Sequence, residues 1–424
     1  MTIARTGTRL TLVNTRAYIS RQRKGLLAGW MAQTMVATSS LSLAPLAILL
    51  QDDFGLTRAE LGIMLSAGSM GALVSALPAG WLSDVLGVRR VVAAALLWSG
   101  FSFTVVSLVH SLPLSLALLF ISGLGTGVIS PATTKAILYW FAARFRGTAM
   151  GIKQTGYALG GALAAAILPT LALALGGWRA AVLAVGIVAT VIGGAYYLLY
   201  SEHPQQTVGG VRQTSGLTML RAVSGDSRIL VLCVLAFCYG YNQSTYMSYL
   251  SLYLQETVGV SIVAAGFFLT IGQMSGAAGR VGWGIVSDRF FGGRRTPVML
   301  ALTGLCGVVA LAFGPVMPLL PEYGALALIM IFGAVAVGWS GLYHVFVGET
   351  AGREKAGTAV GLCLMVCAGG TVVGPPVFGY IVDATRSYPL AWSSQALFAL
   401  VGVAAILWLR RGSEAPVPLA SGAD

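Results

Sequence analysis

The sequence predicts an all-α membrane protein with twelve transmembrane helices in two six-helix, pseudo-symmetric bundles. Three observations lead to this prediction. The 424 residues are 56% hydrophobic and only 9% charged, whereas a soluble domain carries about 25% charged residues. Apolar segments recur along the whole chain, and short patterns in its first half return in its second half.

The apolar segments are long enough to cross a bilayer, which takes about 20 residues of helix. They cover residues 25–50, 60–82, 89–109, 113–140, 147–170, 179–200, 229–254, 262–286, 297–318, 322–347, 356–382 and 390–409. The polar stretch 201–228 divides them into two sets of six. We therefore expect five parts: an N-terminal tail (1–24), an N-terminal six-helix bundle (25–200), a linker (201–228), a C-terminal six-helix bundle (229–410) and a C-terminal tail (411–424).

Lysine and arginine positions set the orientation, because cytoplasmic loops are enriched in positive residues. Of the 26 such residues, only Arg58, Arg179 and Arg386 fall on the external side, and three lie within spans. The tails and the linker are thus expected to be cytoplasmic, in a bacterial cytoplasmic (inner) membrane. The basic N-terminus precedes an apolar segment without a convincing cleavage site, which indicates an uncleaved first span.

Two patterns repeat between the halves. GWLSDVLGVRR, with Gly80, Asp84, Arg89 and Arg90, returns as GIVSDRFFGGRR, with Gly284, Asp288, Arg294 and Arg295. The run GTAMG at 147–151 returns as GTAVG at 357–361, at the start of the fifth span of each half. Parallel repeats of this kind are typical of transporters with a substrate site near the bilayer midplane.

The first pattern resembles the loop between spans two and three of the major facilitator superfamily, and the resemblance covers essentially the whole chain. Val85 stands where an arginine is common in that family. The resemblance implies a gate, in which the two aspartates lie near helix N-termini of the opposite half, where a carboxylate is favoured. Its residues are Asp84, Arg89, Arg90, Asp288, Arg294 and Arg295. The alternative is that these charges only set topology.

The segment from Trp140 to Gly151 resembles the fourth-to-fifth span junction of the organic-anion branches. These branches are carboxylate:proton symporters, oxalate/formate exchangers and monocarboxylate transporters. Arg280, four residues before Gly284, resembles the eighth-span arginine that binds substrate carboxylate in the last two. The partner charge of those branches is missing, since Gly276 is not an acid and span eleven has no lysine.

Arg280, Lys153 and Lys135 are the cations within spans, where an ionised side chain costs at least a few kcal/mol. Arginine can bind a carboxylate through two parallel hydrogen bonds. Lys135 near the end of span four and Lys153 near the start of span five are expected at similar depth. These three are candidate ligands of an anion. The alternatives are that the lysines reach toward the headgroups and that Arg280 does so or bonds helix-end carbonyls.

Polar residues complete the candidate site. Span seven places Tyr239, Asn242, Gln243 and Tyr246 on one helical face, which suits either a cavity wall or interhelical packing. Gln33 and Thr34 in span one and Tyr157 in span five add hydrogen-bonding groups. His344 in span ten is a candidate proton carrier, or a packed histidine. The acids lie at span ends, loops and tails; Glu60, Glu256 and Asp383 are expected outside.

The predicted function is secondary active transport of a small organic anion, a carboxylate, imported with a proton by alternating access. Anion exchange, uniport and efflux of drugs or amphipathic compounds are the alternatives. The chain shows no nucleophile, metal cluster or phosphate loop, so we expect no enzyme, no metal and no cofactor. The expected partners are an anionic small molecule, protons as a candidate, and the lipid bilayer. Dispersed basic residues argue against nucleic acid, and we expect a monomer.

Overall fold

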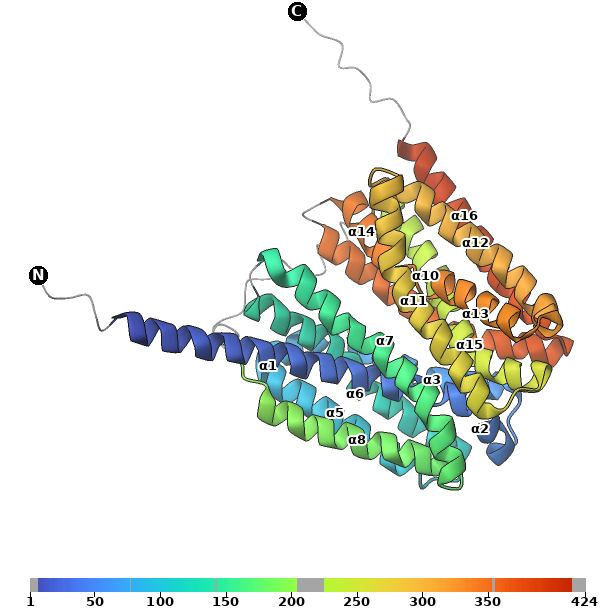
Figure 1. Cartoon of the computed structure of the whole chain (residues 1–424), viewed down its shortest axis with the longest axis horizontal. Coiled ribbons are helices and arrows are strands. Elements are labelled where there is room, and N and C mark those ends of the chain that lie inside the picture. The colour runs from blue at the N-terminus through green and yellow to red at the C-terminus, as the bar shows by residue number, and fades with distance from the viewer. Residues whose placement is uncertain (1–6, 77, 142, 204–224, 353–354, 414–424) are drawn as a thin grey trace, which may run out of the picture. The chain divides into compact units, whose positions relative to one another are not determined.

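The computed structural model describes residues 7–76, 78–141, 143–203, 225–352 and 355–413, and within these ranges it contains helices, turns and no β-strand (Figure 1). The first half forms α1 (Gly7–Leu41), α2 (Ala47–Phe54), α3 (Arg58–Ala76), α4 (Ala79–Leu86), α5 (Val88–Val106), α6 (Leu112–Trp140), α7 (Ala143–Ala174) and α8 (Trp178–Leu199). The second half forms α10 (Ser227–Tyr253), α11 (Ile262–Phe290), α12 (Arg295–Val316), α13 (Glu322–Ala336), α14 (Ser340–Ala351), α15 (Ala356–Thr385) and α16 (Tyr388–Ser413).

Eleven helical segments of the described chain are long and apolar enough to cross a membrane. The expected seventh span, α10, is not among them although it has 27 residues, because its tyrosines, asparagine and glutamine lower its hydropathy. With α10 the helices make the twelve spans of an all-α membrane protein, as the sequence predicts. Helix α1 begins at Gly7, inside the segment assigned to the tail.

Three spans are interrupted where the sequence predicts continuous helices. A 3₁₀ turn, Ala44–Leu46, separates α1 from α2 and contains Pro45. Pro78 precedes α4, where its ring and missing N–H suit the first turn of a new helix rather than the middle of an old one. The tenth span divides into α13 and α14 around Gly338.

The chain forms two compact units, which are described separately. Unit 1 comprises Met1–Gln213, Met247–Met274 and Pro375–Asp383, and unit 2 comprises Thr214–Tyr246, Ser275–Gly374 and Ala384–Asp424. The division therefore passes through α10, α11 and α15, and unit 1 holds Met247–Tyr253 of α10, Ile262–Met274 of α11 and Pro375–Asp383 of α15. The five-part division at 25–200 and 229–410 stays a prediction.

Within unit 1, the long α1 runs beside α7 and α6, and α5 lies against α6 and α8 (Figure 1). Helix α3 packs along α6. Small residues make these contacts close: a Cβ on Gly100 of α5 would lie 2.7 Å from the carbonyl oxygen of Gly186 in α8. Such approaches are typical of membrane helices, which associate through backbone proximity.

Within unit 2, α12 packs along α16 and against α13 and α14. Its apolar core takes buried side chains from α10, α12, α14, α15 and α16, among them Leu232, Met299, Leu342, Cys363 and Ile406. This core fixes the N-terminal part of α10 and the start of α14, which carry several of the predicted site residues.

Candidate functional site

Arg280 lies in α11 and points at the interruption of the tenth span. Its side chain is half-buried, and its Nε atom donates a hydrogen bond to the carbonyl oxygen of Val337, 3.4 Å away. Val337 is the C-cap residue that follows Ala336, the last residue of α13. The arginine thus bonds a carbonyl at a helix end, which is one of the two alternatives to anion binding given above. This bond holds its guanidinium group beside the break.

The break has its own hydrogen-bond requirements, because the last four carbonyls of a helix lack N–H partners inside it. Trp283, one turn beyond Arg280 on α11, donates its Nε1–H to the carbonyl oxygen of Ala334 at 2.9 Å. Gly338 brings the two helices together, since a Cβ there would lie 3.0 Å from the Cα of Gly279. Two side chains of α11 therefore bond carbonyl oxygens at the end of α13, those of Ala334 and Val337.

Trp339 and His344 flank the start of α14. The Nε1–H of Trp339 bonds Oε1 of Gln243 at 2.9 Å, which joins α10 to the break. The Nε2 atom of His344 is buried and has no hydrogen-bond partner among the described residues. The ring centroids of Trp339 and His344 lie 6.3 Å apart. Unit 2 thus brings together Arg280, Gln243 and His344 of the predicted ligands around the break.

The other residues of the span-seven face make contacts inside unit 2. Tyr239 shares a 2.5 Å hydrogen bond with Thr303 of α12, and Asn242 Nδ2 lies 3.9 Å from the Sγ atom of Cys306. The hydroxyl of Tyr246 donates to the carbonyl oxygen of Ile329 in α13 at 3.0 Å. All three side chains are buried. These contacts are the interhelical packing that the sequence leaves open for this face.

Lys153 lies in unit 1, where its side chain is 1% exposed. Its Nζ atom donates to Thr134 Oγ1 at 3.0 Å and to the carbonyl oxygen of Ser130 at 3.3 Å, with Ser130 Oγ at 3.5 Å. Both partners belong to α6, the fourth span, so Lys153 lies against that span one residue from the position of Lys135; their similar depth in the membrane stays a prediction. Lys135, one residue beyond Thr134, is half-buried. The partners of Lys153 in these bonds are neutral oxygens, which do not balance its charge.

The remaining predicted ligands of unit 1 lie on α1 and α7. Gln33 is 3% exposed, and its Oε1 atom accepts no hydrogen bond from the described residues. Thr34 donates its hydroxyl to Trp30 within its own helix at 2.9 Å, and Tyr157 is half-buried. Trp30 Nε1 donates to Thr155 Oγ1 at 3.1 Å, a link between α1 and α7 that the sequence did not suggest.

The first gate pattern surrounds the start of α5. Arg89 donates its backbone N–H to Glu202 Oε1 at 3.1 Å and its Nε–H to the carbonyl oxygen of Tyr197 at 2.6 Å. Glu202 thus supplies a carboxylate at a helix N-terminus, where it is favoured. Arg90 is exposed. The side chain of Asp84 lies outside the part of the chain that the structure describes.

The second gate pattern joins α11, α12 and α14. Arg295 forms ion pairs with Asp288 Oδ1 at 2.5 Å and with Glu349 Oε1 at 3.4 Å. The backbone carbonyl of Arg294 accepts a hydrogen bond from Ser287 Oγ at 3.3 Å. Asp288 and Arg295 of the predicted gate are therefore paired within unit 2. Their proposed partners in the opposite half remain a prediction.

Sequence reasoning missed several of these contacts. It had no signal for the break of the tenth span beyond Gly338 itself, and it assigned no role to Trp283. Glu202 was assigned to the linker. It lies next to the start of α5 in the structure but 113 residues from Arg89 in the sequence, so no sequence motif connects the two. Sequence reasoning counted Arg58 only as an external charge, although Arg58 forms ion pairs with Glu256 and Asp383.

Comparison with known protein families matches residues 29–375 to the Major Facilitator Superfamily. Curated relatives include the probable sulfoacetate transporter SauU of Cupriavidus necator, 28% identical over 84% of this chain and 86% of that protein. The probable L-galactonate transporter of Escherichia coli is 25% identical over 88% and 85% of the two chains. The hexuronate transporter of Bacillus subtilis is 23% identical over 86% and 89%.

Solved structures with the same fold include a bacterial homolog of the human lysosomal transporter Spinster, in an inward-facing and unoccupied conformation. Its TM-score is 0.79, at 16% identity, over 94% of this chain and 99% of the other. The D-xylose-proton symporter has a TM-score of 0.73, at 17% identity, over 92% and 97%. At these identities the likeness shows the fold alone. The family match covers most of the sequence, so the chain belongs to the major facilitator superfamily and is a transporter rather than an enzyme.

Proposed function

We propose that this transporter carries a small organic anion, a carboxylate, by alternating access and imports it together with a proton. The observation that carries the proposal is the position of Arg280, whose guanidinium group is held at the break of the tenth span by the carbonyl oxygen of Val337. Arginine matches a carboxylate or a sulfonate geometrically, because its planar group donates two parallel hydrogen bonds.

The broken helix supports an anionic substrate for a second reason. Discontinuous spans in transporters direct the positive N-terminal end of a half-helix toward anionic groups of the substrate. Helix α14 starts at Ser340, directly after the break. Gly341 in its first turn lies against Arg280, since a Cβ there would be 2.6 Å from the Arg280 carbonyl oxygen. The guanidinium group and the start of α14 therefore favour negative charge together.

The balance of charge in the spans supports the same conclusion. Lys153 is buried against the neutral oxygens of Ser130 and Thr134, and it adds positive potential to the N-terminal half. In this proposal Arg280 contacts the substrate directly, and Lys153 and Lys135 are further candidate ligands. Gln243, Tyr157, Gln33 and Thr34 are candidate hydrogen-bonding groups, and Tyr239, Asn242 and Tyr246 support them by packing.

The relatives narrow the substrate class. Sulfoacetate, L-galactonate and hexuronate, the compounds in the names of three relatives, are all organic anions. None of these names denotes a lipophilic cation, and such a cation would meet like charge at Arg280. We therefore favour organic-anion transport over drug efflux.

Proton coupling rests on His344, because histidine is the side chain whose ordinary pKa lies nearest to physiological pH. Its Nε2 atom is buried and has no hydrogen-bond partner among the described residues, which supports a role in binding or releasing a proton when an anion binds at Arg280. In this proposal both termini lie in the cytoplasm, as the distribution of lysine and arginine indicates. The protein acts as a monomer in the bacterial inner membrane. Anion exchange is the alternative mechanism, since it needs no titrating group.

Uptake into proteoliposomes tests the proposal. The panel contains sulfoacetate, galactonate and glucuronate, with galactose as a neutral control of similar size. We expect saturable uptake of at least one anion, inhibition by other anions, no uptake of galactose, and faster uptake when the outer solution is more acidic. Uptake that depends on a trapped internal anion and ignores the pH gradient would support exchange. Absence of anion uptake, with transport of amphipathic compounds, would support efflux.

A further inference from the structure

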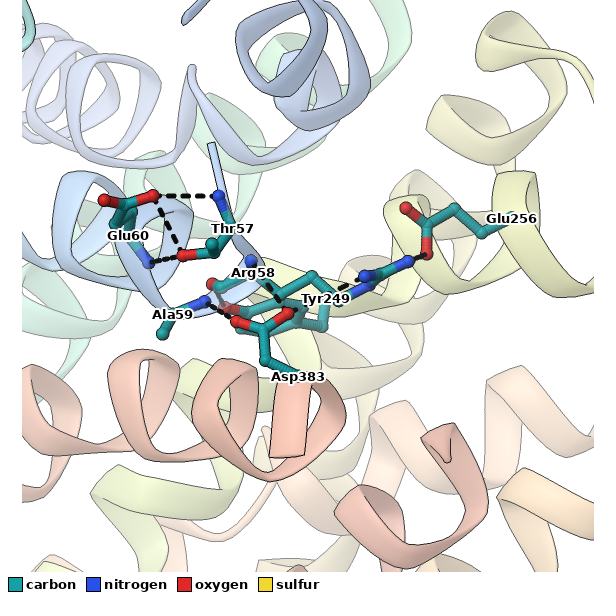
Figure 2. Close-up of polar contacts among 7 residues, drawn as sticks. All are labelled: Thr57, Arg58, Ala59, Glu60, Tyr249, Glu256 and Asp383. Carbon is teal, nitrogen blue, oxygen red and sulfur yellow. Dashed lines mark hydrogen bonds and ion pairs between the residues drawn. The ribbon is translucent and has the colours of Figure 1, made fainter. Parts of the chain in front are cut away.

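A group of charges that the candidate site does not include lies at the first turn of α3 (Figure 2). Arg58 reaches Glu256, which follows α10: Nη2 lies 2.8 Å and Nε 3.1 Å from the Oε2 atom. The Nη1 atom of Arg58 also lies 3.7 Å from Oδ1 of Asp383, near the end of α15. One arginine of the N-terminal half thus pairs with two acids of the C-terminal half, all within unit 1.

Asp383 does more than neutralise Arg58, because it also caps α3. Its carboxylate accepts the backbone N–H groups of Arg58 at 3.2 Å and Ala59 at 2.8 Å. A helix N-terminus needs such acceptors and favours negative charge. Helices usually take this cap from the residue just before them, but here it comes from 325 residues away. Tyr249 of α10 adds a bond from its hydroxyl to the Arg58 carbonyl oxygen at 2.6 Å.

The backbones of α3 and α15 are in direct contact beside these charged side chains. A Cβ on Gly62 of α3 would lie 2.5 Å from the carbonyl oxygen of Pro375 in α15 and 2.7 Å from the hydroxyl oxygen of Tyr249. A Cβ on Gly379 would collide with the Arg58 carbonyl oxygen. Glycine is therefore required for α3 and α15 to approach this closely, and the junction between them is tightly closed.

A second junction in unit 1 joins α7 to the start of α11, without charges. Gln273 Nε2 donates to the carbonyl oxygen of Gly161 at 3.1 Å, and Thr270 Oγ1 donates to that of Ala162 at 3.2 Å. Spans two and eight correspond in the two repeats, as do spans five and eleven. The contact between α3 and α15 therefore corresponds, under the pseudo-symmetry, to the contact between α7 and α11. Of these two, the contact between α3 and α15 is the one that carries the ion pairs of Arg58.

We propose that Arg58, Glu256 and Asp383 form a latch, which holds the carrier closed on its external side and opens whenever the carrier opens to the outside. The inference rests on the alternating access of the proposed function and on the orientation that puts all three residues outside. The side chains of Arg58, Asp383 and Glu256 are 32%, 25% and 19% exposed. Partly exposed ion pairs are weak, because water and salt screen them, so this latch can open reversibly.

A distance measurement between two spin labels tests the latch without any substrate. Labels are attached to Asp52→Cys on α2 and Val263→Cys on α11, both exposed positions, in a Cys367→Ser background. The four other cysteines are buried. Double electron–electron resonance in lipid nanodiscs then gives the populations with short and long label separations. We expect a dominant short distance in the protein with an intact latch.

The informative variants remove one carboxylate each. Asp383→Asn should raise the ratio of the long-distance to the short-distance population about tenfold, which corresponds to ~1.4 kcal/mol, because it loses an ion pair and charged bonds to the α3 cap. Glu256→Gln leaves that cap in place and should raise the ratio roughly threefold. Should Asp383→Asn not fold, Glu256→Gln still decides the question.

The control is Glu60→Gln, in the same first turn of α3. Figure 2 shows that Glu60 bonds Thr57 within its own turn, with Oε2 2.9 Å from the Thr57 backbone nitrogen. Its replacement should leave the distance distribution unchanged. The latch would be rejected if Glu256→Gln, and Asp383→Asn where it folds, kept the parent distribution, or if Glu60→Gln shifted it equally. The distance measurement uses no ligand, so its outcome does not depend on whether the transported anion is a carboxylate. Failure of the latch and failure of the proposed function can therefore be told apart.

Discussion

The Nε atom of Arg280 lies 3.4 Å from the carbonyl oxygen of Val337, so a charged side chain of the eighth span is bonded to the residue at which the tenth span breaks. The bond satisfies a helix-end carbonyl and orients the guanidinium group at the same time. Under the proposed function, an anion bound by Arg280 also acts on the position of α14, which begins three residues after Val337.

The hydrogen bond between Trp339 and Gln243 should contribute to stability. Gln243→Ala would leave the Nε1–H of Trp339, a residue only 3% exposed, without its acceptor. An unsatisfied buried donor costs roughly 1–3 kcal/mol, so we expect a clear fall in the melting temperature of the purified protein. Gln154→Ala removes an exposed glutamine and should change little. Equal melting temperatures for the two variants would show that the Trp339 bond does not stabilise the fold.

Lys153→Met should stabilise the protein while it weakens anion binding. The change removes a cation from the interior of a span, where its described partners are neutral, and methionine is unbranched and only one heavy atom shorter than lysine. We expect a gain of roughly 1 kcal/mol or more in the free energy of unfolding, measured as a higher melting temperature. Thr134→Val, which deletes one acceptor of the ammonium group, should act in the opposite direction.

The two variants are expected to change the melting temperature in opposite directions, so the comparison separates a structural role of Lys153 from a binding role. If the ammonium group served only to tie α7 to α6, Lys153→Met and Thr134→Val would both lower the melting temperature. A stabilised Lys153→Met variant that binds the anion as tightly as the parent would instead remove Lys153 from the binding account.

Gly87 and Gly361 should respond differently to alanine. Gly87 has φ 82° and ψ 152° at the start of α5, a conformation that costs other residues about 1–3 kcal/mol, and its new Cβ would collide with the Glu202 carboxylate. Gly361 lies inside α15 with no atom within 4 Å of a new Cβ, so alanine there should gain up to about 1 kcal/mol. Melting temperatures of the two variants check both signs; a Gly87→Ala protein as stable as the parent would contradict the close contact with Glu202.

The sequence was sufficient for the all-α fold class and the order of the spans, because membrane spans are visible as long apolar runs, but it did not show where spans are interrupted. It also singled out Arg280 and Lys153 as candidate ligands, since a charged residue inside an apolar run is visible in the sequence whichever way its side chain points. Their partners were not predictable. Whether Lys153 meets Ser130 and Thr134 depends on the rotation of α6 about its axis, which the apolar pattern does not specify when a helix is hydrophobic on all sides.

Contacts between distant segments were hidden for a different reason. Arg58, Glu256 and Asp383 were each placed on the external side, but 198 residues separate Arg58 from Glu256, and one sequence carries no record of such pairing. The polar face of span seven was recognised from helical spacing, yet spacing could not tell a cavity wall from packing. The structure places Tyr239, Asn242 and Tyr246 in contacts with α12 and α13.

The central claim, that Arg280 binds the transported anion, is tested most directly by the dissociation constant of the anion, measured by isothermal titration calorimetry. We expect Arg280→Ala to abolish detectable binding and Arg280→Lys, which keeps the charge but not the planar fork, to weaken it about tenfold or more. Arg289→Ala, an exposed arginine on the same helix, should bind like the parent. Binding of the anion to Arg280→Ala with the affinity of the parent would contradict the account.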